Sequence, residues 1–417
     1  MEFCRDGSKR KSQGAPSLFL AALLVSVVAL QARAQTYQVI YNLTGTTGSN
    51  PPAGLAVDSS GNLYGTGSGG GVYGEGTVFE LSPSGSAWDA TVLHNFNWNP
   101  QQQTSDGANP HAAVVFGPNG SLFGTTGSGG DPQSGGTVFE LSHSGGIWNE
   151  SILHAFTFGS DGGNPFASVV FDPSGNLYGT TISGGTSNFG VVYELSATSG
   201  WQETVLWDFG ATPGDGLNPV SNITFNLGGH IYGTTESGGL YRNGAVYELT
   251  KYGSIWEERT LYSFKGATDG EFPVGGLIAD AANNLYGTTS LGGPNGGGTV
   301  FELTPSGTTW QFHLLYAFQG NGQQTGPFGG LVMDSTGALY GTTYADALGV
   351  GNVFRLAPSG GNWVYTDLHD FTDSPDGAYP VGSLVFDAHG NLYGTTGAGG
   401  SGTGCAATCG TVFEVTP

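Results

Sequence analysis

The 417-residue chain carries 32 acidic residues against ten basic ones, and 76 of its residues are glycine. A partner held through phosphate groups requires clustered lysine and arginine, so the charge balance argues against nucleic acid and against anionic membrane surfaces. The acidity favours solubility and leaves cations as conceivable partners.

Residues 1–34 have the features of a secretory signal peptide. Four basic residues lie within the first 11, an apolar run spans 18–30, and Ala32-Arg33-Ala34 has the small-x-small pattern of a cleavage site. The run is too short for a membrane span, and no second such run follows. We therefore predict a secreted or periplasmic mature chain, 35–417, without a membrane span; an uncleaved N-terminal anchor is the alternative. Cleavage would leave five basic and 30 acidic residues, a net charge of about −25.

One sequence unit then occurs seven times. Its first string reads NLYGTG at 62–67 and returns in varied form at 121–126, 176–181, 230–235, 284–289, 338–343 and 391–396. Successive copies are 59, 55, 54, 54, 54 and 53 residues apart. A second string, GTVFEL in the first copy, follows each one after a glycine-rich stretch. This regular period indicates a repeat architecture.

Each complete unit contains four runs that are typical of β-strands. In the third unit they are 167–172, 177–181, 191–195 and 203–209, rich in aromatic and β-branched residues and separated by turn sequences. No helical period of apolar residues occurs after residue 34. Near-continuous apolar runs predict strands that are covered on both faces, as in blades stacked side by side.

These units predict an all-β, seven-bladed β-propeller with four antiparallel strands in each blade. The seventh unit stops after its third run, and 36–43 resembles the missing fourth run. The N-terminal strand is therefore expected to complete the last blade and close the ring, a division that a linear array would not need. We place the blades approximately at 51–96, 110–156, 165–209, 219–264, 273–318, 327–371 and 380–415 with 36–43.

The paired strings LYGTT and GTVFEL resemble the GloVer-type tandem repeat, an uncharacterised repeat of exported bacterial proteins. The resemblance covers essentially all of 36–417. It implies a propeller fold and export, and it brings no established activity.

Cys405 and Cys409 lie four residues apart in a predicted loop. In an oxidising compartment this spacing favours a local disulfide. A metal site would need further ligands, and no histidine or other cysteine lies nearby in the sequence. The small ring is expected to stiffen its loop more than it stabilises the protein.

Residues that recur in register are interpreted as structural. A tryptophan precedes the fourth run in six units and is expected to pack between blades. Six residues later each unit has His, Trp or Tyr, so the histidines there are interpreted as packing residues. Glutamate recurs on the third run, with Arg355 in the sixth copy, and a structural role at the rim is favoured over metal binding or acid–base chemistry.

The loops that enter five of the blades share the sequence Asp-Gly-x-x-Pro. In a propeller these loops lie on one face, around the axis, together with the loops between the second and third strands. Asp-Gly is an ordinary turn signal and proline directs the chain into extended geometry. Five carboxylates at a channel mouth could nevertheless bind Ca²⁺, the one cofactor considered. The candidate ligands are Asp106, Asp161, Asp215, Asp269 and Asp376.

The loops between the second and third strands vary while the strands do not, and a specific site would be built there. Aromatic rings among Asn, Gln, Ser and Asp can stack on sugars. Packing within the loops is an equal alternative for these rings. The candidates are Tyr73, Trp98, Phe189, Tyr241, Phe272, Phe328, Tyr344 and Tyr379.

The sequence contains no zinc-protease, nucleophile-elbow or P-loop motif. The leading hypothesis is therefore a secreted, monomeric, non-catalytic protein that binds a polysaccharide or a cell-surface protein through the loop face. One alternative is an extracytoplasmic enzyme, lyase-like by analogy of fold alone, with its site at the channel mouth. The other is a structural envelope protein.

Overall fold

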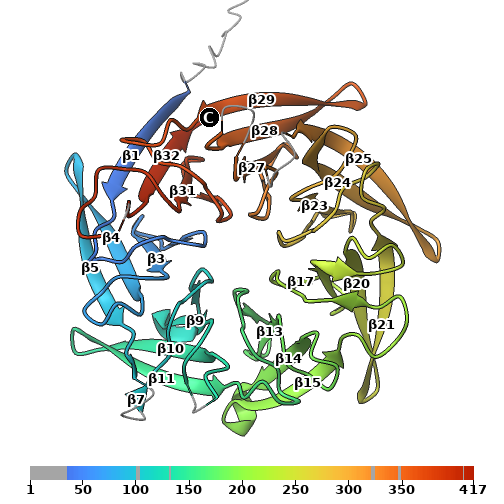
Figure 1. Cartoon of the computed structure of the whole chain (residues 1–417), viewed down its shortest axis with the longest axis horizontal. Helices are drawn as coiled ribbons and strands as arrows, with labels where there is room; N and C mark the ends of the chain where they lie inside the picture. Colours follow the sequence, from blue (N-terminus) through green and yellow to red (C-terminus); the bar gives the residue numbers. More distant parts are fainter. Residues whose placement is uncertain (1–34, 100–103, 131–132, 321–324, 346–348, 407) are drawn as a thin grey trace, which may run out of the picture. The chain divides into compact units, whose positions relative to one another are not determined.

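The computed structural model describes residues 35–417 except 100–103, 131–132, 321–324, 346–348 and 407. The predicted signal peptide lies outside the described residues and stays a prediction. The described residues form seven four-stranded antiparallel sheets that surround a central axis (Figure 1). This arrangement confirms the predicted seven-bladed propeller. Within these residues, no helix is long and apolar enough to cross a membrane.

The strands of the first four blades run outward from the axis in chain order. The first blade contains β2 (Ala56–Val57), β3 (Leu63–Gly67), β4 (Thr77–Ser84) and β5 (Ala87–Asn95). The second contains β8 (Val115–Phe116), β9 (Leu122–Thr126), β10 (Thr137–Ser144) and β11 (Ile147–Ala155). The third contains β12 (Val170–Phe171), β13 (Leu177–Thr181), β14 (Val191–Ser196) and β15 (Gln202–Asp208). The fourth contains β17 (Thr224–Phe225), β18 (Ile231–Thr235), β20 (Ala245–Tyr252) and β21 (Ile255–Ser263).

The remaining blades repeat this order. The fifth contains β22 (Ile278–Ala279), β23 (Leu285–Thr289), β24 (Gly296–Ser306) and β25 (Thr309–Gln319). The sixth contains β26 (Val332–Met333), β27 (Leu339–Thr343), β28 (Asn352–Ser359) and β29 (Asn362–Asp370). The seventh contains β30 (Val385–Phe386), β31 (Leu392–Thr396), β32 (Thr411–Thr416) and β1 (Thr36–Asn42). Two short ribbons, β6 (Trp98–Asn99) with β7 (Thr104–Ser105) and β16 (Gly216–Leu217) with β19 (Ser237–Gly238), and the 3₁₀ turns Pro118–Gly120 and Ala197–Ser199 lie in the connections.

The N-terminal strand closes the ring as predicted. β1 pairs antiparallel with β32, from Thr36 opposite Thr416 to Asn42 opposite Thr411, and the first and last coloured strands lie side by side (Figure 1). Tyr37 on β1 also stacks on His369 of the sixth blade, with ring centroids 3.5 Å apart. The strand therefore links the last blade to its neighbour as well as completing it.

The repeated strings are explained by close contacts within and between blades. The glycine of LYGTT lies beneath the aromatic ring of GTVFEL; a Cβ on Gly65 would lie 2.6 Å from the Phe79 ring. The next residue, a buried threonine, donates its hydroxyl proton to a backbone carbonyl of the following blade. At the seven seams these hydrogen bonds join Thr66 to Ala112, Thr125 to Ala167, Thr180 to Ser221, Thr234 to Gly275, Thr288 to Gly329, Thr342 to Gly382 and Thr395 to Ala53, at 2.8–3.4 Å.

The hydrophobic core lies between the blades. The cluster between the second and third blades, for example, contains Val138 and Phe156 from one and Leu177 and Tyr193 from the other, all at 0% exposure. The recurring tryptophans take part as predicted, since Trp88 lies 6.2 Å from the Tyr393 ring of the preceding blade.

The recurring glutamates are less exposed than the sequence suggested. Glu80 is half-buried on β4 and accepts a hydrogen bond from the Tyr64 hydroxyl at 3.1 Å. In the sixth copy Arg355 donates to the Tyr340 hydroxyl at 3.0 Å instead. The hydroxyl of the LYGTT tyrosine can donate or accept, so this position tolerates either charge.

The innermost strands are shorter than expected. The third unit has two residues of strand, Val170–Phe171, where the sequence predicted 167–172. Ala167, at the start of the predicted run, lies outside the strand, and its carbonyl instead accepts the seam hydrogen bond from Thr125 of the neighbouring blade. Close to the axis, hydrogen bonds to a neighbouring blade thus replace part of the hydrogen bonding between strands of the same blade.

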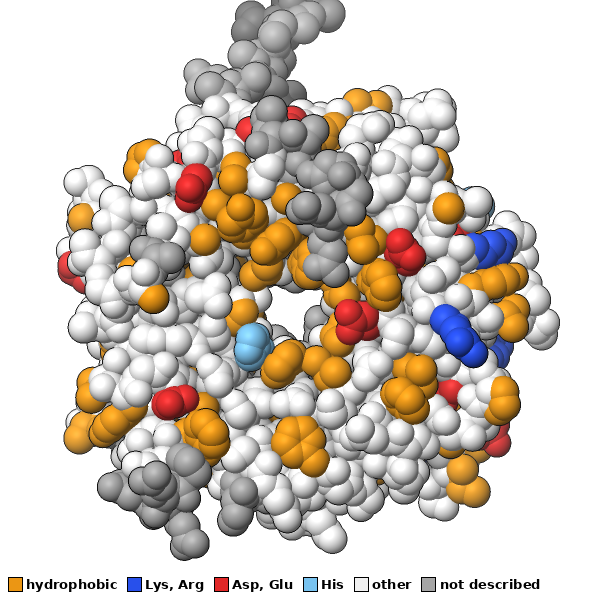
Figure 2. All heavy atoms as spheres, in the orientation of Figure 1, with side chains coloured by type: hydrophobic (Ala, Val, Ile, Leu, Met, Phe, Trp, Pro, Cys, Tyr) orange, Lys and Arg blue, Asp and Glu red, His pale blue; other side chains and the backbone are white. Residues whose placement is uncertain are grey.

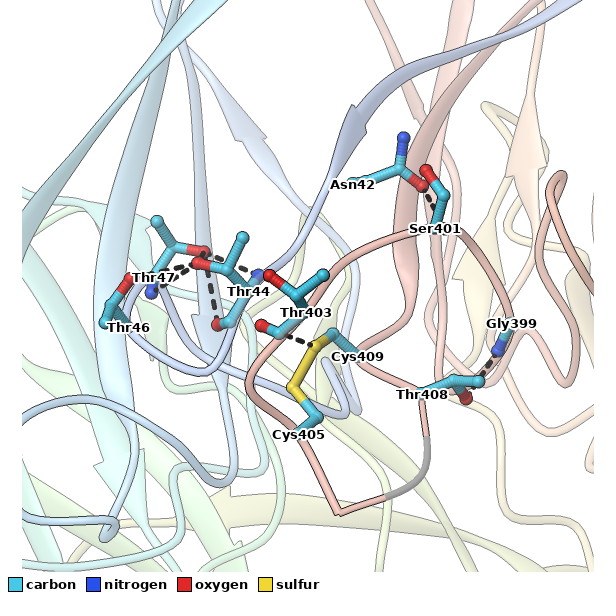
Figure 3. The surroundings of a disulfide bond; sticks show 10 residues. All are labelled: Asn42, Thr44, Thr46, Thr47, Gly399, Ser401, Thr403, Cys405, Thr408 and Cys409. Atoms are coloured by element: carbon cyan, nitrogen blue, oxygen red, sulfur yellow. Dashed lines mark hydrogen bonds between the residues drawn. A yellow bond between two sulfur atoms is a disulfide. The ribbon is translucent and has the colours of Figure 1, made fainter.

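The predicted disulfide between Cys405 and Cys409 is present in the loop between β31 and β32, with Cα atoms 5.5 Å apart (Figure 3). The same loop holds the segment that follows β1. Thr403 accepts a hydrogen bond from the Gly45 amide at 2.9 Å, and the Ser401 amide donates to Asn42 Oδ1 at 2.7 Å. The disulfide therefore constrains a loop that supports ring closure.

Replacing Tyr37 by alanine is expected to lower the free energy of unfolding by about 2–3 kcal/mol, because a half-buried ring that joins two blades is lost. Urea denaturation followed by tryptophan fluorescence measures the change. The matched control is Tyr252→Ala at the tip of the β20–β21 hairpin, where the side chain is 61% exposed; it should cost at most about 0.5 kcal/mol. Equal losses in the two variants would contradict the closing role of β1.

Candidate functional site

Two sets of loops form one face of the propeller, which we call the loop face. The loop that enters a blade pairs with the loop between the second and third strands of that blade. The paired residues are Ser49 with Gly69, Ala108 with Ser128, Gly163 with Ser183, Glu271 with Leu291, Ala378 with Ala398, and in the fourth blade β16 with β19. The two loop types thus share one face, as the sequence analysis assumed.

A central cavity of about 510 Å³ opens along the axis. Its walls come from the segments that lead into the first strands of all seven blades, beginning with the residue that follows each blade-entry proline. That residue is Pro52, His111, Phe166, Val220, Val274, Phe328 or Val381. Figure 2 shows the opening, rimmed largely by hydrophobic side chains. Among the described residues that line the cavity, His111 alone is ionisable, and burial lowers its pKa.

Three of the eight aromatic candidates contact one another: Phe328 lines the cavity, and Tyr344 and Tyr379 lie beside it without lining it. Tyr344 lies 5.0 Å from Phe328 and 5.0 Å from Tyr379, measured between ring centroids, and the two tyrosines are nearly parallel at 29°. We call Phe328, Tyr344 and Tyr379 the aromatic sector. A further pair, His111 and Phe166, stacks at 4.3 Å in the second and third blades. Phe166 was not among the predicted candidates, although it directly follows a blade-entry proline as Phe328 does.

The other five aromatic candidates are distributed over separate loops. Tyr73, Phe189 and Tyr241 are 55%, 39% and 48% exposed on the first, third and fourth blades. Trp98 lies in the β6–β7 ribbon between the first and second blades, and Phe272 enters the fifth. Among the described residues, none of these five rings contacts the aromatic sector.

The five candidate aspartates each stabilise a turn at a different seam. Asp106 illustrates the pattern: Oδ1 accepts from the Asn97 amide at 2.7 Å, and Oδ2 lies 3.0 Å from His94 Nε2. The others accept from the backbone amides of Thr157 (Asp161), Gly210 (Asp215), Lys265 (Asp269) and Thr372 (Asp376), at 2.8–2.9 Å. This explains why the position near the end of the fourth strand is occupied by His, Trp or Tyr in different units. Each of these side chains can face an aspartate with an N–H or O–H group.

The structure does not gather these aspartates at the channel mouth. None of the five lines the cavity. In the part of the chain that is described, no group of three or more His, Cys, Asp or Glu side chains is placed to hold a metal ion. Their hydrogen bonds agree with the turn interpretation, and the Ca²⁺ interpretation gains no support from the geometry.

Three glutamates that the sequence analysis did not single out lie in the seams beside these turns. Glu150, Glu203 and Glu258 occupy the same position on β11, β15 and β21, opposite the leucine of the second string. The pKa of each is raised to about 7, mainly by burial and in part by the charges of Asp106, Asp161 and Asp215 respectively; His94 partly offsets the shift for Glu150 and Thr260 for Glu258. An alignment of the seven units in register would have revealed them.

Later seams use aromatic stacking at this position. Phe312 stacks on Tyr262 at 4.5 Å, and Tyr365 on Tyr316 at 4.4 Å. The ring is therefore chemically asymmetric although its backbone is repetitive.

The fold and the loop-face opening define a β-propeller with a candidate binding site on its axis. The model of the Gloeobacter/Verrucomicrobia repeat matches residues 25–226 and 219–417, and the chain belongs to this family. The match confirms the family indicated by the paired strings. Among curated protein sequences, none matches the chain.

Solved structures share the fold at low sequence identity. The extracellular domain of a provisionally assigned hybrid two-component system from B. thetaiotaomicron is 13% identical with a TM-score of 0.58; the match covers 91% of this chain and 39% of that one. A provisionally assigned 6-phosphogluconolactonase from Bacteroides uniformis is 13% identical with a TM-score of 0.51; the match covers 82% of this chain and 88% of that one. This chain thus spans about two fifths of the length of the first protein. Both likenesses concern the fold alone.

The seam glutamates predict that stability falls as the pH rises. Their pKa in the folded protein, about 7, exceeds the usual value of 4.5, so folding favours the protonated form. The stabilising contribution is complete at a pH below the pKa of glutamate in the unfolded chain and is lost as the pH rises through 7. It amounts to about 1–2 kcal/mol for each glutamate after allowing for screening by solvent. His154 opposes this in acid, because burial lowers its pKa.

The triple variant Glu150→Gln, Glu203→Gln and Glu258→Gln should therefore flatten the dependence of the denaturation midpoint on pH between about pH 5 and about pH 8. Calorimetry or urea denaturation across this range measures it. Glu257→Gln, an exposed neighbour on β21, is the control and should leave the profile unchanged. A triple variant with the wild-type slope would contradict the assignment.

Proposed function

We propose that the protein is an exported, non-catalytic binding protein that holds a neutral carbohydrate at the loop-face opening of its channel. The observation that carries the proposal is the aromatic sector, in which Phe328, Tyr344 and Tyr379 come together beside a cavity of about 510 Å³. Sites of this size that combine aromatic walls with a few polar groups are typical of small-molecule recognition.

The chemistry of the opening favours sugars over charged ligands. Aromatic faces pack on the apolar C–H faces of a pyranose ring, and the nearby walls contain polar side chains such as Ser168, Asn222 and Ser383 for its hydroxyl groups. The single ionisable lining residue, His111, has a lowered pKa and is uncharged at neutral pH. The strong negative charge of the whole chain disfavours anionic ligands.

An extracytoplasmic location is part of the proposal. The predicted signal peptide supports it, and so does the resemblance in fold to a domain that is itself described as extracellular. The disulfide between Cys405 and Cys409 fits an oxidising compartment.

The purified protein should bind at least one member of a panel of neutral oligosaccharides (cello-, xylo-, malto-, manno-, laminari- and chito-oligosaccharides), with a dissociation constant of about 10⁻⁵ to 10⁻³ M. Isothermal titration calorimetry measures the affinity. Phe328→Val, which introduces the residue found after proline in three other blades, should weaken binding about tenfold or more. Tyr73→Ala, on an exposed loop of the first blade, is the control and should bind as the wild type does.

Three results would count against the proposal. Absence of binding to the whole panel would remove the carbohydrate version and leave a surface protein as the ligand to seek. Loss of binding in Tyr73→Ala but not in Phe328→Val would show that the binding site lies on the loop of the first blade and not at the channel. Release of cleavage products from a bound oligosaccharide, detected by chromatography, would show that the protein is an enzyme.

A further inference from the structure

We infer that Tyr379, supported by Tyr344, is the principal stacking surface for the sugar ring, and that the chain accepts backbone strain to place it there. The inference rests on the proposed function and specifies its central contact. It comes from comparing equivalent positions around the ring.

The residue before the blade-entry proline has a left-handed backbone in six of the seven units. The φ angles are 50° at Asn50, 53° at Asn109, 55° at Asn164, 58° at Asn218, 54° at Phe272 and 57° at Tyr379. Asparagine accepts this conformation more readily than other residues with a side chain, whereas for a bulky residue it is a genuine outlier. Four copies therefore have the residue that suits the backbone, and two have an aromatic ring.

The backbone, rather than the side chain, imposes this conformation. The Tyr379 amide donates to Val350 O of the preceding blade at 2.9 Å, and its carbonyl accepts from the Gly397 amide of its own blade at 3.0 Å. Asn218 makes the equivalent bonds, to Phe189 O at 2.9 Å and from the Glu236 amide at 3.0 Å. These two bonds hold residue 379 in the left-handed conformation, whereas Gly326, whose amide donates to Ser290 O instead, has no left-handed φ.

Asparagine also contributes a hydrogen bond that the aromatic residues cannot make. In the four asparagine copies, side-chain Nδ2 donates to the loop between the second and third strands. The bonds join Asn50 to Ser68, Asn109 to Ser128, Asn164 to Gly127 and Asn218 to Ile182, at 2.8–3.2 Å. Tyrosine at 379 thus forgoes a side-chain tie between the two loops and adds strain, a combined penalty of roughly fivefold or more in the folding equilibrium.

What Tyr379 gains within the described structure is its stack on Tyr344. Tyr344 is itself a departure from the repeat, because the equivalent residue is Ser68, Gly127, Ser290 or Gly397 in four other units. Phe328 is a third departure, at the position after the proline. Residues held in unfavourable conformations concentrate at binding sites, where the surrounding structure compensates the strain.

Phe272 provides an internal control for this reasoning. It has the same left-handed backbone as Tyr379, with φ of 54°. It lies in the fifth blade and, among the described residues, it stacks on no other ring. Relief of strain at Phe272 and at Tyr379 should therefore affect stability alike and binding differently.

The test compares four variants of the whole protein: Tyr379→Asn, Tyr379→Phe, Tyr344→Ser and Phe272→Asn. Thermal denaturation and titration with cellohexaose, xylohexaose, maltohexaose, mannohexaose, laminarihexaose and chitohexaose are measured on each. Tyr379→Asn should raise the melting temperature by roughly 1–3 °C and weaken the tightest wild-type interaction at least tenfold. Tyr344→Ser should weaken it similarly, Tyr379→Phe by no more than about threefold, and Phe272→Asn should raise the melting temperature without changing the affinity.

The results separate this inference from the proposed function. If the wild type binds one of these sugars and Tyr379→Asn binds it equally well, the inference is wrong while the proposed function stands. A lower melting temperature in Tyr379→Asn would show that the ring serves packing, and an equal loss of affinity in Phe272→Asn would show that strain relief itself impairs binding; either result overturns the inference. If the wild type binds none of the sugars, both the inference and the carbohydrate version of the function fail.

Discussion

The ring depends on one hydrogen bond that recurs at every seam. A threonine hydroxyl from the second strand of each blade donates to a carbonyl in the segment that leads into the first strand of the next blade, including the seam between Thr395 and Ala53 that joins the two ends of the chain. The hydroxyls are almost completely buried, so a broken bond would leave an unsatisfied polar group at a cost of about 1–3 kcal/mol. The bond also fixes the position of the innermost strand beside the axis. The seam and the wall of the cavity are therefore the same piece of structure, and the opening keeps its shape because the blades cannot separate without exposing these groups.

Farther from the axis, the seams share a backbone and differ in chemistry. Glu150, Glu203 and Glu258 face turn aspartates in three seams, whereas Phe312, Tyr365 and Tyr37 stack on rings in three others. A repeat scaffold tolerates both solutions because each seam is an almost independent interface between neighbours. The aromatic sector belongs to the sixth and seventh blades, where the seams lack these glutamates. We expect the site to keep its geometry over a pH range in which the opposite part of the ring becomes less stable.

Sequence periodicity predicted those features that every unit repeats. The seven blades, the closing strand at 36–43, the packing role of Trp88 and the disulfide were all accessible from the sequence, because each is encoded by local pattern or by register. Other features arise only when blades meet. The strand predicted at 167–172 shortens to Val170–Phe171 because Ala167 bonds to the neighbouring blade. The left-handed conformation of Tyr379 depends on bonds to residues in two different blades. The stacking partners of Tyr344 likewise come from loops that are distant in sequence, so listing aromatic loop residues gave eight candidates and could not show which three meet.

The candidate site consists of residues that depart from the repeat. A single departure from a repeat can be neutral, as Phe123 is where other units have tyrosine. Beside the channel, three departures at three different positions of the unit are in contact: Phe328, which follows the blade-entry proline and lines the cavity, Tyr344, which follows the LYGTT string, and Tyr379, which precedes the proline. Each is a large ring where most other units have a smaller or more compatible residue, and one of them opposes the preference of its own backbone. Single rings occur at two of these positions elsewhere, as Phe166 and Phe272, but among the described residues no other unit brings three rings together there. The proposed recognition of a ligand would account for why the rings are together, why they lie beside the channel, and why one of them is strained.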